Sequence, residues 1–201
     1  MNKPPPARAG ANYALDTRPL LNFIYTDALP VLERLLGRPL YVPAGVHEQF
    51  GRAESVLRRR LEQLPERQRD PFDVLVLERL QAARSQFRGN PFRIVRLYDA
   101  ERDLAIRLEQ EPGVDPGESE VLALSLSRDW MAVLDDRLAH DFAVSQGIET
   151  LGTLDLLVQA VQQGILNLKD GERLLDEMRL RWQRAPRGRL RDYVNGRRSI
   201  W

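Results

Sequence analysis

The chain has 201 residues, of which 43% are hydrophobic and 29% charged, and its formal net charge is +1. This length suits one domain with an appendage better than two independent domains, because domain sizes peak at about 100 to 150 residues. No apolar run reaches the roughly 18 residues needed to cross a bilayer, so we expect a cytoplasmic protein that does not contact membranes. The chain lacks cysteine, which excludes disulfides and thiolate metal sites.

Short apolar segments alternate with longer amphipathic stretches along the chain. The pattern predicts strands at 13–15, 40–43, 92–97, 131–134 and 148–151. It predicts helices at 19–36, 45–50, 52–64, 72–87, 99–110, 118–126, 137–146, 154–163 and 170–182. Such alternation is typical of an α/β fold, a three-layer α/β/α sandwich around a parallel sheet.

The same pattern divides the chain into three parts. Residues 1–12 are rich in proline and alanine and are expected to form a flexible lead-in. The main α/β domain is expected at 13–168, with a polar helical insertion at 52–91. A last helix and an arginine-rich extension follow at 169–201.

Acidic residues follow several of the predicted strands. Asp16, Glu48 and Asp136 each come shortly after a short apolar strand, and Glu120 opens a helix after a proline- and glycine-rich turn. Ligand sites of open parallel sheets lie beyond the carboxyl ends of the strands, so these acids are expected at one edge. Grouped carboxylates raise each other's pKa unless a cation neutralises them, and Mg²⁺ or Mn²⁺ prefers such oxygen ligands.

Each of these acids also has a purely structural explanation. An aspartate after a strand often caps the next helix, and a glutamate in a first turn complements the helix dipole. Four acids at corresponding places favour a shared site over four separate caps. The pattern alone indicates an acid-lined α/β fold without naming a reaction.

Arginines are concentrated at the C-terminal end, where they outnumber the single acid Asp192. Such a basic segment is expected either to contact the phosphate backbone of a nucleic acid or to form a solvated charged run. The candidates for phosphate contact in this segment are Arg181, Arg184, Arg187 and Arg189.

Taken together and in order, several segments resemble the PIN-domain family. They are Leu15-Asp16-Thr17-Arg18-Pro19, Tyr41-Val42-Pro43 through Glu48, Gly117-Glu118-Ser119-Glu120 and Val133-Leu134-Asp135-Asp136-Arg137. The stretch from Gly152-Thr153-Leu154 to Leu166 resembles the closing segment of the branch whose third motif reads Gly-Glu-x-Glu. The joint occurrence of these segments is more specific than any one of them.

The resemblance implies a PIN-type fold and a ribonuclease activity that depends on Mg²⁺ or Mn²⁺. The PIN family includes VapC-type toxins of toxin–antitoxin pairs. By analogy, the catalytic metal ligands are expected to be Asp16, Glu48, Glu120 and Asp136, with Asp135 and Glu118 as neighbours able to substitute. Expected RNA contacts are Thr17, Arg18 and Arg137 together with the C-terminal arginines. RNA, an antitoxin protein and a second copy of the chain in a homodimer are the expected partners.

One position departs from the family pattern. Arg18 stands where the family usually has a small hydroxyl residue, although Thr17 still offers a hydroxyl group. A catalytically silent PIN scaffold that binds RNA or protein is therefore the alternative. A receiver-like signalling domain is disfavoured because no suitable lysine follows late in the sheet, and the chain has no dinucleotide-binding, Walker or His-Glu-x-x-His motif.

Overall fold

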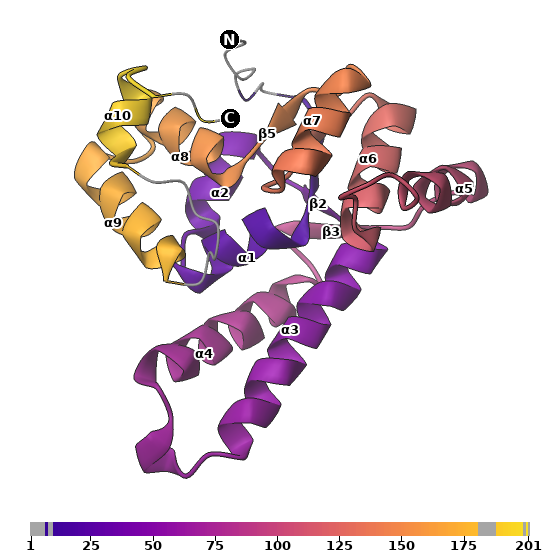
Figure 1. Ribbon diagram of the computed structural model, residues 1–201. Helices are drawn as coiled ribbons and strands as arrows, with labels where there is room; N and C mark the ends of the chain where they lie inside the picture. Colours follow the sequence, from indigo (N-terminus) through magenta and orange to yellow (C-terminus); the bar gives the residue numbers. More distant parts are fainter. Residues whose placement is uncertain (1–6, 8–9, 181–187, 199, 201) are drawn as a thin grey trace.

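The computed structural model describes residues 7, 10–180, 188–198 and 200 (Figure 1). Its described part contains one parallel sheet in the order β3-β2-β1-β4-β5. The strands are β1 (Tyr13–Leu15), β2 (Leu40–Pro43), β3 (Phe92–Val95), β4 (Met131–Val133) and β5 (Thr150–Leu151). This architecture confirms the predicted three-layer α/β/α fold.

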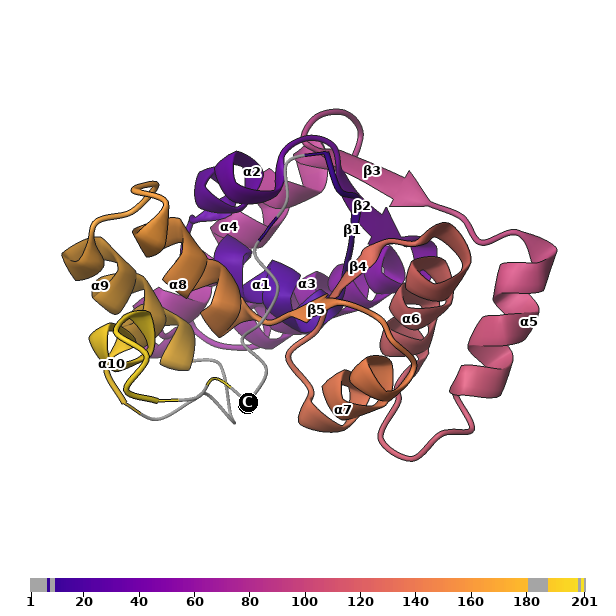
Figure 2. The same cartoon turned by 90° about the horizontal axis from the view of Figure 1, so that it is seen from above.

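Helices cover both faces of the sheet. On one side lie α1 (Thr17–Tyr25), α2 (Leu29–Leu36), α8 (Thr153–Gln162), α9 (Leu168–Arg179) and α10 (Leu190–Val194). On the other side lie α5 (Asp99–Leu108), α6 (Pro116–Arg128) and α7 (Arg137–Ser145), as Figure 2 shows. Because both faces are covered, the central strands are apolar throughout: Ala14, Leu15 and Val133 are fully buried.

Two long helices form a hairpin that extends beyond the sheet (Figure 1). They are α3 (Ala44–Glu62) and α4 (Pro71–Gln86), joined through a short 3₁₀ turn at Glu66–Gln68. The predicted helical segments 45–50 and 52–64 both belong to α3, which continues through Gly51. Phe50, Leu57 and Leu61 continue one buried face across the glycine, and this packing outweighs the cost of about 1 kcal/mol for an interior glycine.

The helix predicted at 19–36 is also wrong, because the structure divides it into α1 and α2. The chain turns between them at Asp27, which has a φ of 55° in the left-handed region. Aspartate adopts this conformation more readily than most residues. The division lets Phe23 and Leu32 both reach the core, where each is fully buried.

The C-terminal region contains a short helix that the sequence pattern did not predict. In α10, Leu190 is fully buried and Tyr193 nearly so, and the carboxylate of Glu172 accepts hydrogen bonds from the backbone N–H groups of Leu190 (2.9 Å) and Arg191 (3.1 Å). The described part of the arginine-rich segment is thus packed against α8 and α9. Of the candidate phosphate contacts there, Arg189 is exposed, whereas Arg181, Arg184 and Arg187 lie outside the described residues.

None of the helices that the structure describes combines the length and the apolar character needed to span a membrane.

The hairpin provides a test of how its helices are held together. Glu54 on α3 is 2% exposed, and its Oε2 lies 2.7 Å from Nη1 of Arg84 on α4. We expect Arg84→Met to lower the free energy of unfolding by about 1 to 3 kcal/mol, because the variant leaves a buried carboxylate without its charged partner. Urea denaturation measures this, with Arg58→Met on the exposed face of α3 as the control. Equal losses in the two variants would contradict the assigned role of the pair.

Candidate acidic site

The carboxyl ends of β1 and β4 meet where the strand order of the sheet reverses. From β1 the chain adds β2 and then β3 on one side, whereas β4 and β5 lie on the other. Leu15 is in register with Val133, and the N–H of Asp16 donates to the carbonyl of Val133 at 3.0 Å. Such a switch point is the usual place of a ligand site in an open parallel sheet, and Asp16, Asp135 and Asp136 all follow these two strands.

Asp16 is the N-cap residue of α1 and is almost fully buried, with 1% of its surface exposed. Its Oδ2 accepts a hydrogen bond from the N–H of Arg18 at 3.3 Å. Its Oδ1 is buried and has no hydrogen-bond partner. The residue therefore caps a helix with one oxygen and leaves the other available.

Glu118 has the same division of roles. Asp115 caps α6 by accepting from the N–H groups of Gly117 (2.8 Å) and Glu118 (2.9 Å) through its Oδ1. Glu118 completes this capping box, since its Oε2 accepts from the N–H of Asp115 at 2.9 Å. The other oxygen, Oε1, is buried without a partner, and the residue is 1% exposed.

Asp135 and Asp136 follow β4, and their oxygens are already engaged. Asp135 accepts from the N–H and the hydroxyl of Thr153, both at 2.7 Å, and from Nδ2 of Asn22 at 3.0 Å. Asp136 caps α7 through Oδ1, which accepts from the N–H of Leu138 at 2.9 Å. Its Oδ2 lies 3.0 Å from Nη1 of Arg18.

These surroundings change the acidity of the carboxyl groups. Burial, reinforced by the charge of Asp115, raises the pKa of Asp16 to about 7. Burial also raises the pKa of Glu118 to about 8, with added repulsion from Asp16, Asp115 and Asp136. The charges of these three aspartates are therefore near enough to Glu118 to disfavour its ionised form.

The acids after β4 respond in opposite directions. Burial raises the pKa of Asp135 to about 6, although the hydrogen bonds from Thr153 and Asn22 oppose the rise. Partial burial also raises the pKa of Asp136, but the hydrogen bond from Arg18 and the N–H groups at the start of α7 outweigh it. The net result holds the pKa of Asp136 below its ordinary value.

Glu48 and Glu120, the other two predicted ligands, lie near each other at a neighbouring position. Oε2 of Glu120 accepts from the N–H of Gly45 at 2.8 Å, and Glu48 is exposed on the first turns of α3. Burial, followed by the charges of Glu48 and Glu109, raises the pKa of Glu120. Electrostatic repulsion thus couples Glu118 to Asp16, whereas it couples Glu120 to Glu48.

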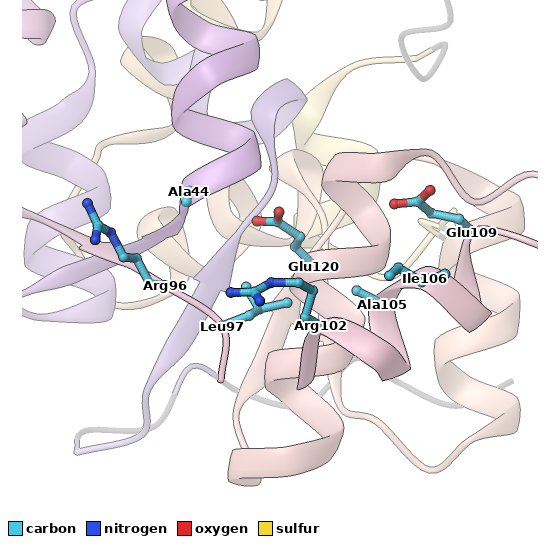
Figure 3. A pocket seen from close by; sticks show the side chains of 8 residues that line it. All are labelled: Ala44, Arg96, Leu97, Arg102, Ala105, Ile106, Glu109 and Glu120. Atoms are coloured by element: carbon cyan, nitrogen blue, oxygen red, sulfur yellow. The ribbon is translucent and has the colours of Figure 1, made fainter. Parts of the chain in front are cut away.

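A cavity of about 260 Å³ opens beside Glu120. Figure 3 shows Glu120 and Arg102 directed into it next to Ala44 at the start of α3, with Arg96 and Glu109 at its edges. Gly45 closes this region tightly, since a Cβ atom there would lie 2.7 Å from Oε1 of Glu120. The cavity therefore carries both signs of charge, from Glu109 and Glu120 and from Arg96 and Arg102.

The remaining predicted residues lie around the acids. The hydroxyl of Thr17 donates to Oε1 of Gln49. Arg137 is exposed and is 3.7 Å from Asp141, its ion-pair partner.

The sequence interpretation missed Asp115, Asn22 and Gln49 as members of the site. Asp115 could have been found, because Asp-x-x-Glu before an apolar run is a capping-box signature. Asn22 and Gln49 carry no such local signal, since their importance comes from contacts with residues distant in the sequence.

The carboxylate oxygens at this site fit a hard divalent cation. At this site Oδ1 of Asp16 and Oε1 of Glu118 are buried without a hydrogen-bond partner, and Mg²⁺ and Mn²⁺ prefer oxygen ligands of this kind. Within the described ranges, no three acidic or histidine side chains already converge as a ready metal-binding group. The unpartnered oxygens of Asp16 and Glu118 are therefore the best-placed pair, with Asp136 beside them.

A family model described as a PIN domain matches residues 76–193, which is more than half of the chain. The chain belongs to the PIN-domain family. A search of curated proteins gave no match. The matched PIN region includes Glu118, Glu120, Asp135 and Asp136, whereas β1 with Asp16 and β2 precede it.

Membership gives the protein a fold of the nuclease type, and PIN nucleases typically use Mg²⁺ or Mn²⁺. The parallel sheet and the acids at its switch point agree with this fold. The protein thus has the fold of the PIN nucleases.

The raised pKa values predict how stability depends on pH without divalent ions. Because folding raises the pKa values of Asp16 and Glu118, the folded protein binds more protons than the unfolded chain from about pH 4 to pH 8. Their contribution is complete below the ordinary carboxyl pKa and is lost as the pH rises through about 7 and 8. We expect the drop in Tm between about pH 5 and pH 8.5 to be smaller in Asp16→Asn by at least about 3 °C.

Thermal melts in a metal chelator measure this difference. His47 and His140 have pKa values lowered by burial and so act in the opposite direction, but both proteins contain them, so they cancel in the comparison. If Tm depends on pH in the same way in both proteins, Asp16 does not have the raised pKa.

Proposed function

We propose that this PIN protein is a Mg²⁺- or Mn²⁺-dependent endoribonuclease of the cytoplasm, with Asp16, Glu118 and Asp136 as the ligands of the ion. The observation that supports it most directly is the pair of buried, unpartnered oxygens, Oδ1 of Asp16 and Oε1 of Glu118, at the switch point of the sheet. Helix caps alone do not require a second buried oxygen without a partner.

The residues of the chain have distinct proposed roles. Asp16 and Glu118 hold the cation, and Asp115 fixes the first turn of α6 so that Glu118 keeps its place. Arg18 and Arg137 bind phosphates of the RNA, which gives affinity without sequence preference. Thr17 and Gln49, joined by a hydrogen bond, lie next to Asp16 and Gly117 and orient the strand that is cut.

When bound, a divalent ion polarises the scissile phosphate and lowers the pKa of a water molecule. We propose products with a 5′-phosphate and a 3′-hydroxyl group. Glu48 and Glu120 interact with each other. We assign them to the outer part of the same edge of the sheet.

The proposal extends to the biological setting. The family includes toxins of toxin–antitoxin pairs, and the α3/α4 hairpin carries exposed apolar side chains, Val56 (69% exposed) and Leu75 (39%). We propose this hairpin as the surface for an antitoxin or a second copy of the chain. Loss of either association in Val56→Asp would support that assignment.

A catalytically silent PIN scaffold is the competing function. The ion pair between Arg18 and Asp136 favours it, because a guanidinium already neutralises one of the acids. The two functions differ in whether the protein binds a divalent ion.

We expect the wild-type protein to cleave single-stranded or hairpin RNA with Mg²⁺ or Mn²⁺ present. Asp16→Asn and Glu118→Gln should reduce the rate at least about a hundredfold, since loss of the ion removes several kcal/mol of transition-state stabilisation. Glu120→Gln is the matched variant, two residues along the same helix, and should lose less. Gel analysis of end-labelled RNA measures all four rates and identifies the product ends.

The relative losses in the two glutamine variants decide which glutamate is the ligand. A greater loss in Glu120→Gln would assign the third ligand to Glu120. Equal cleavage by all four proteins would indicate a contaminating nuclease.

Metal binding can be tested separately from cleavage. Millimolar Mn²⁺ should raise the Tm of the wild-type protein by at least about 3 °C, because a ligand of the native form alone stabilises it by mass action. Asp16→Asn and Glu118→Gln should lose this gain, whereas Glu66→Gln at the exposed hairpin turn should retain it. A wild-type protein with no response to Mn²⁺ or Mg²⁺ would favour the silent scaffold.

A further inference from the structure

Arg18 places a positive charge among the acids of the site. Its Nη1 lies 3.0 Å from Oδ2 of Asp136, and it also interacts electrostatically with Asp16 and Glu118. The guanidinium comes from the second residue of α1, whose N-cap is Asp16. The same short segment thus supplies one acid of the site and a cation that neutralises another.

The ion pair affects the one oxygen of Asp136 that has no structural task. Oδ1 of Asp136 is engaged by N–H groups at the start of α7, so Oδ2 is the oxygen left for a ligand. Arg18 holds that oxygen. Asp16 and Glu118 each keep one oxygen without a partner, whereas the corresponding oxygen of Asp136 has Arg18 as its partner.

We propose that Arg18 is an exchangeable counter-ion: it holds Asp136 while the site is empty of RNA, and transfer of its guanidinium to an RNA phosphate releases Asp136 for the divalent ion. The inference rests on the proposed metal site. It makes phosphate binding and ion binding cooperative, so that the site is completed when substrate is present.

The geometry permits the exchange. The side chain of Arg18 is 49% exposed, so an incoming phosphate reaches it without rearrangement of the core, whereas that of Asp136 is 16% exposed. A guanidinium binds carboxylate and phosphate with the same planar arrangement of donors. A half-exposed ion pair is also weak enough to be replaced, since screening by water reduces its stability.

Thermodynamic linkage means that the exchange affects two measurable affinities, one for the ion and one for phosphate. If phosphate binding strengthens ion binding by some factor, ion binding must strengthen phosphate binding by the same factor. Removing the guanidinium should therefore strengthen ion binding in the absence of phosphate and abolish the response to it.

The test measures Mn²⁺ binding directly, from the loss of the free aqueous Mn²⁺ signal in electron paramagnetic resonance. Adenosine 5′-monophosphate supplies a phosphate but has no internucleotide bond to cleave, and adenosine is its control without phosphate. In the wild-type protein we expect the nucleotide, but not adenosine, to lower the Kd for Mn²⁺ at least about fivefold, the lower end of ordinary coupling factors.

Variants of Arg18 separate the ion pair from a general charge effect. Without nucleotide, Arg18→Met should bind Mn²⁺ at least about fivefold more tightly than the wild type. Addition of the nucleotide should leave the Kd of this variant for Mn²⁺ unchanged. Arg18→Lys keeps the charge and should retain weak binding without nucleotide, and it provides a second variant should the first melt at a lower temperature. Arg173→Met, which removes an arginine paired with Glu177 at 2.7 Å on α9, should behave as the wild type.

The outcomes distinguish this inference from the proposed function. If Asp16→Asn abolishes Mn²⁺ binding while Arg18→Met binds no more tightly than the wild type, the exchange is wrong and the metal site stands. A full nucleotide response in Arg18→Met also overturns the exchange. If none of the proteins binds Mn²⁺, the metal site and the exchange fail together.

Discussion

The parallel pairing of β1 with β4 is the constraint on which the candidate site depends. Because parallel strands end at the same edge, the residues that follow them are brought together although more than a hundred positions separate them in the sequence. The backbone bond from Asp16 to Val133 fixes the height of Asp16 relative to the residues after β4. A shift of one residue in this register would turn these side chains to opposite faces.

Helix capping and site formation are combined in the same acids. Asp16, Asp115 and Asp136 each cap a helix, and Glu118 closes the capping box of α6. A carboxylate has two oxygens, and the cap uses only one of them. The structural and functional explanations of these acids are therefore compatible, and the caps hold the remaining oxygens of Asp16 and Glu118 in a buried position.

The negative charge of the site is reduced in two ways, by burial of Asp16 and Glu118 and by the ion pair of Asp136 with Arg18. Burial of Asp16 and Glu118 raises their pKa values, because water is removed from groups that repel each other. Asp136 is less buried and has a guanidinium partner, so its pKa is lowered instead. The site thus contains acids that favour a proton or a cation beside one acid that already has its cation, and this asymmetry distinguishes it from a uniform carboxylate cluster.

The sequence by itself determined the α/β architecture, because apolar strands covered on both faces and amphipathic helices leave periodic patterns that need no partner to be recognised. It also identified the acids that follow β1 and β4. Only the tertiary structure decided that Glu118 interacts with Asp16 while Glu120 interacts with Glu48, because residues two apart on a helix project from different sides and the packing of α6 selects which side faces β1. The pairing of Arg18 with Asp136 was likewise invisible in the sequence, since it joins residues that only the folded sheet brings into contact.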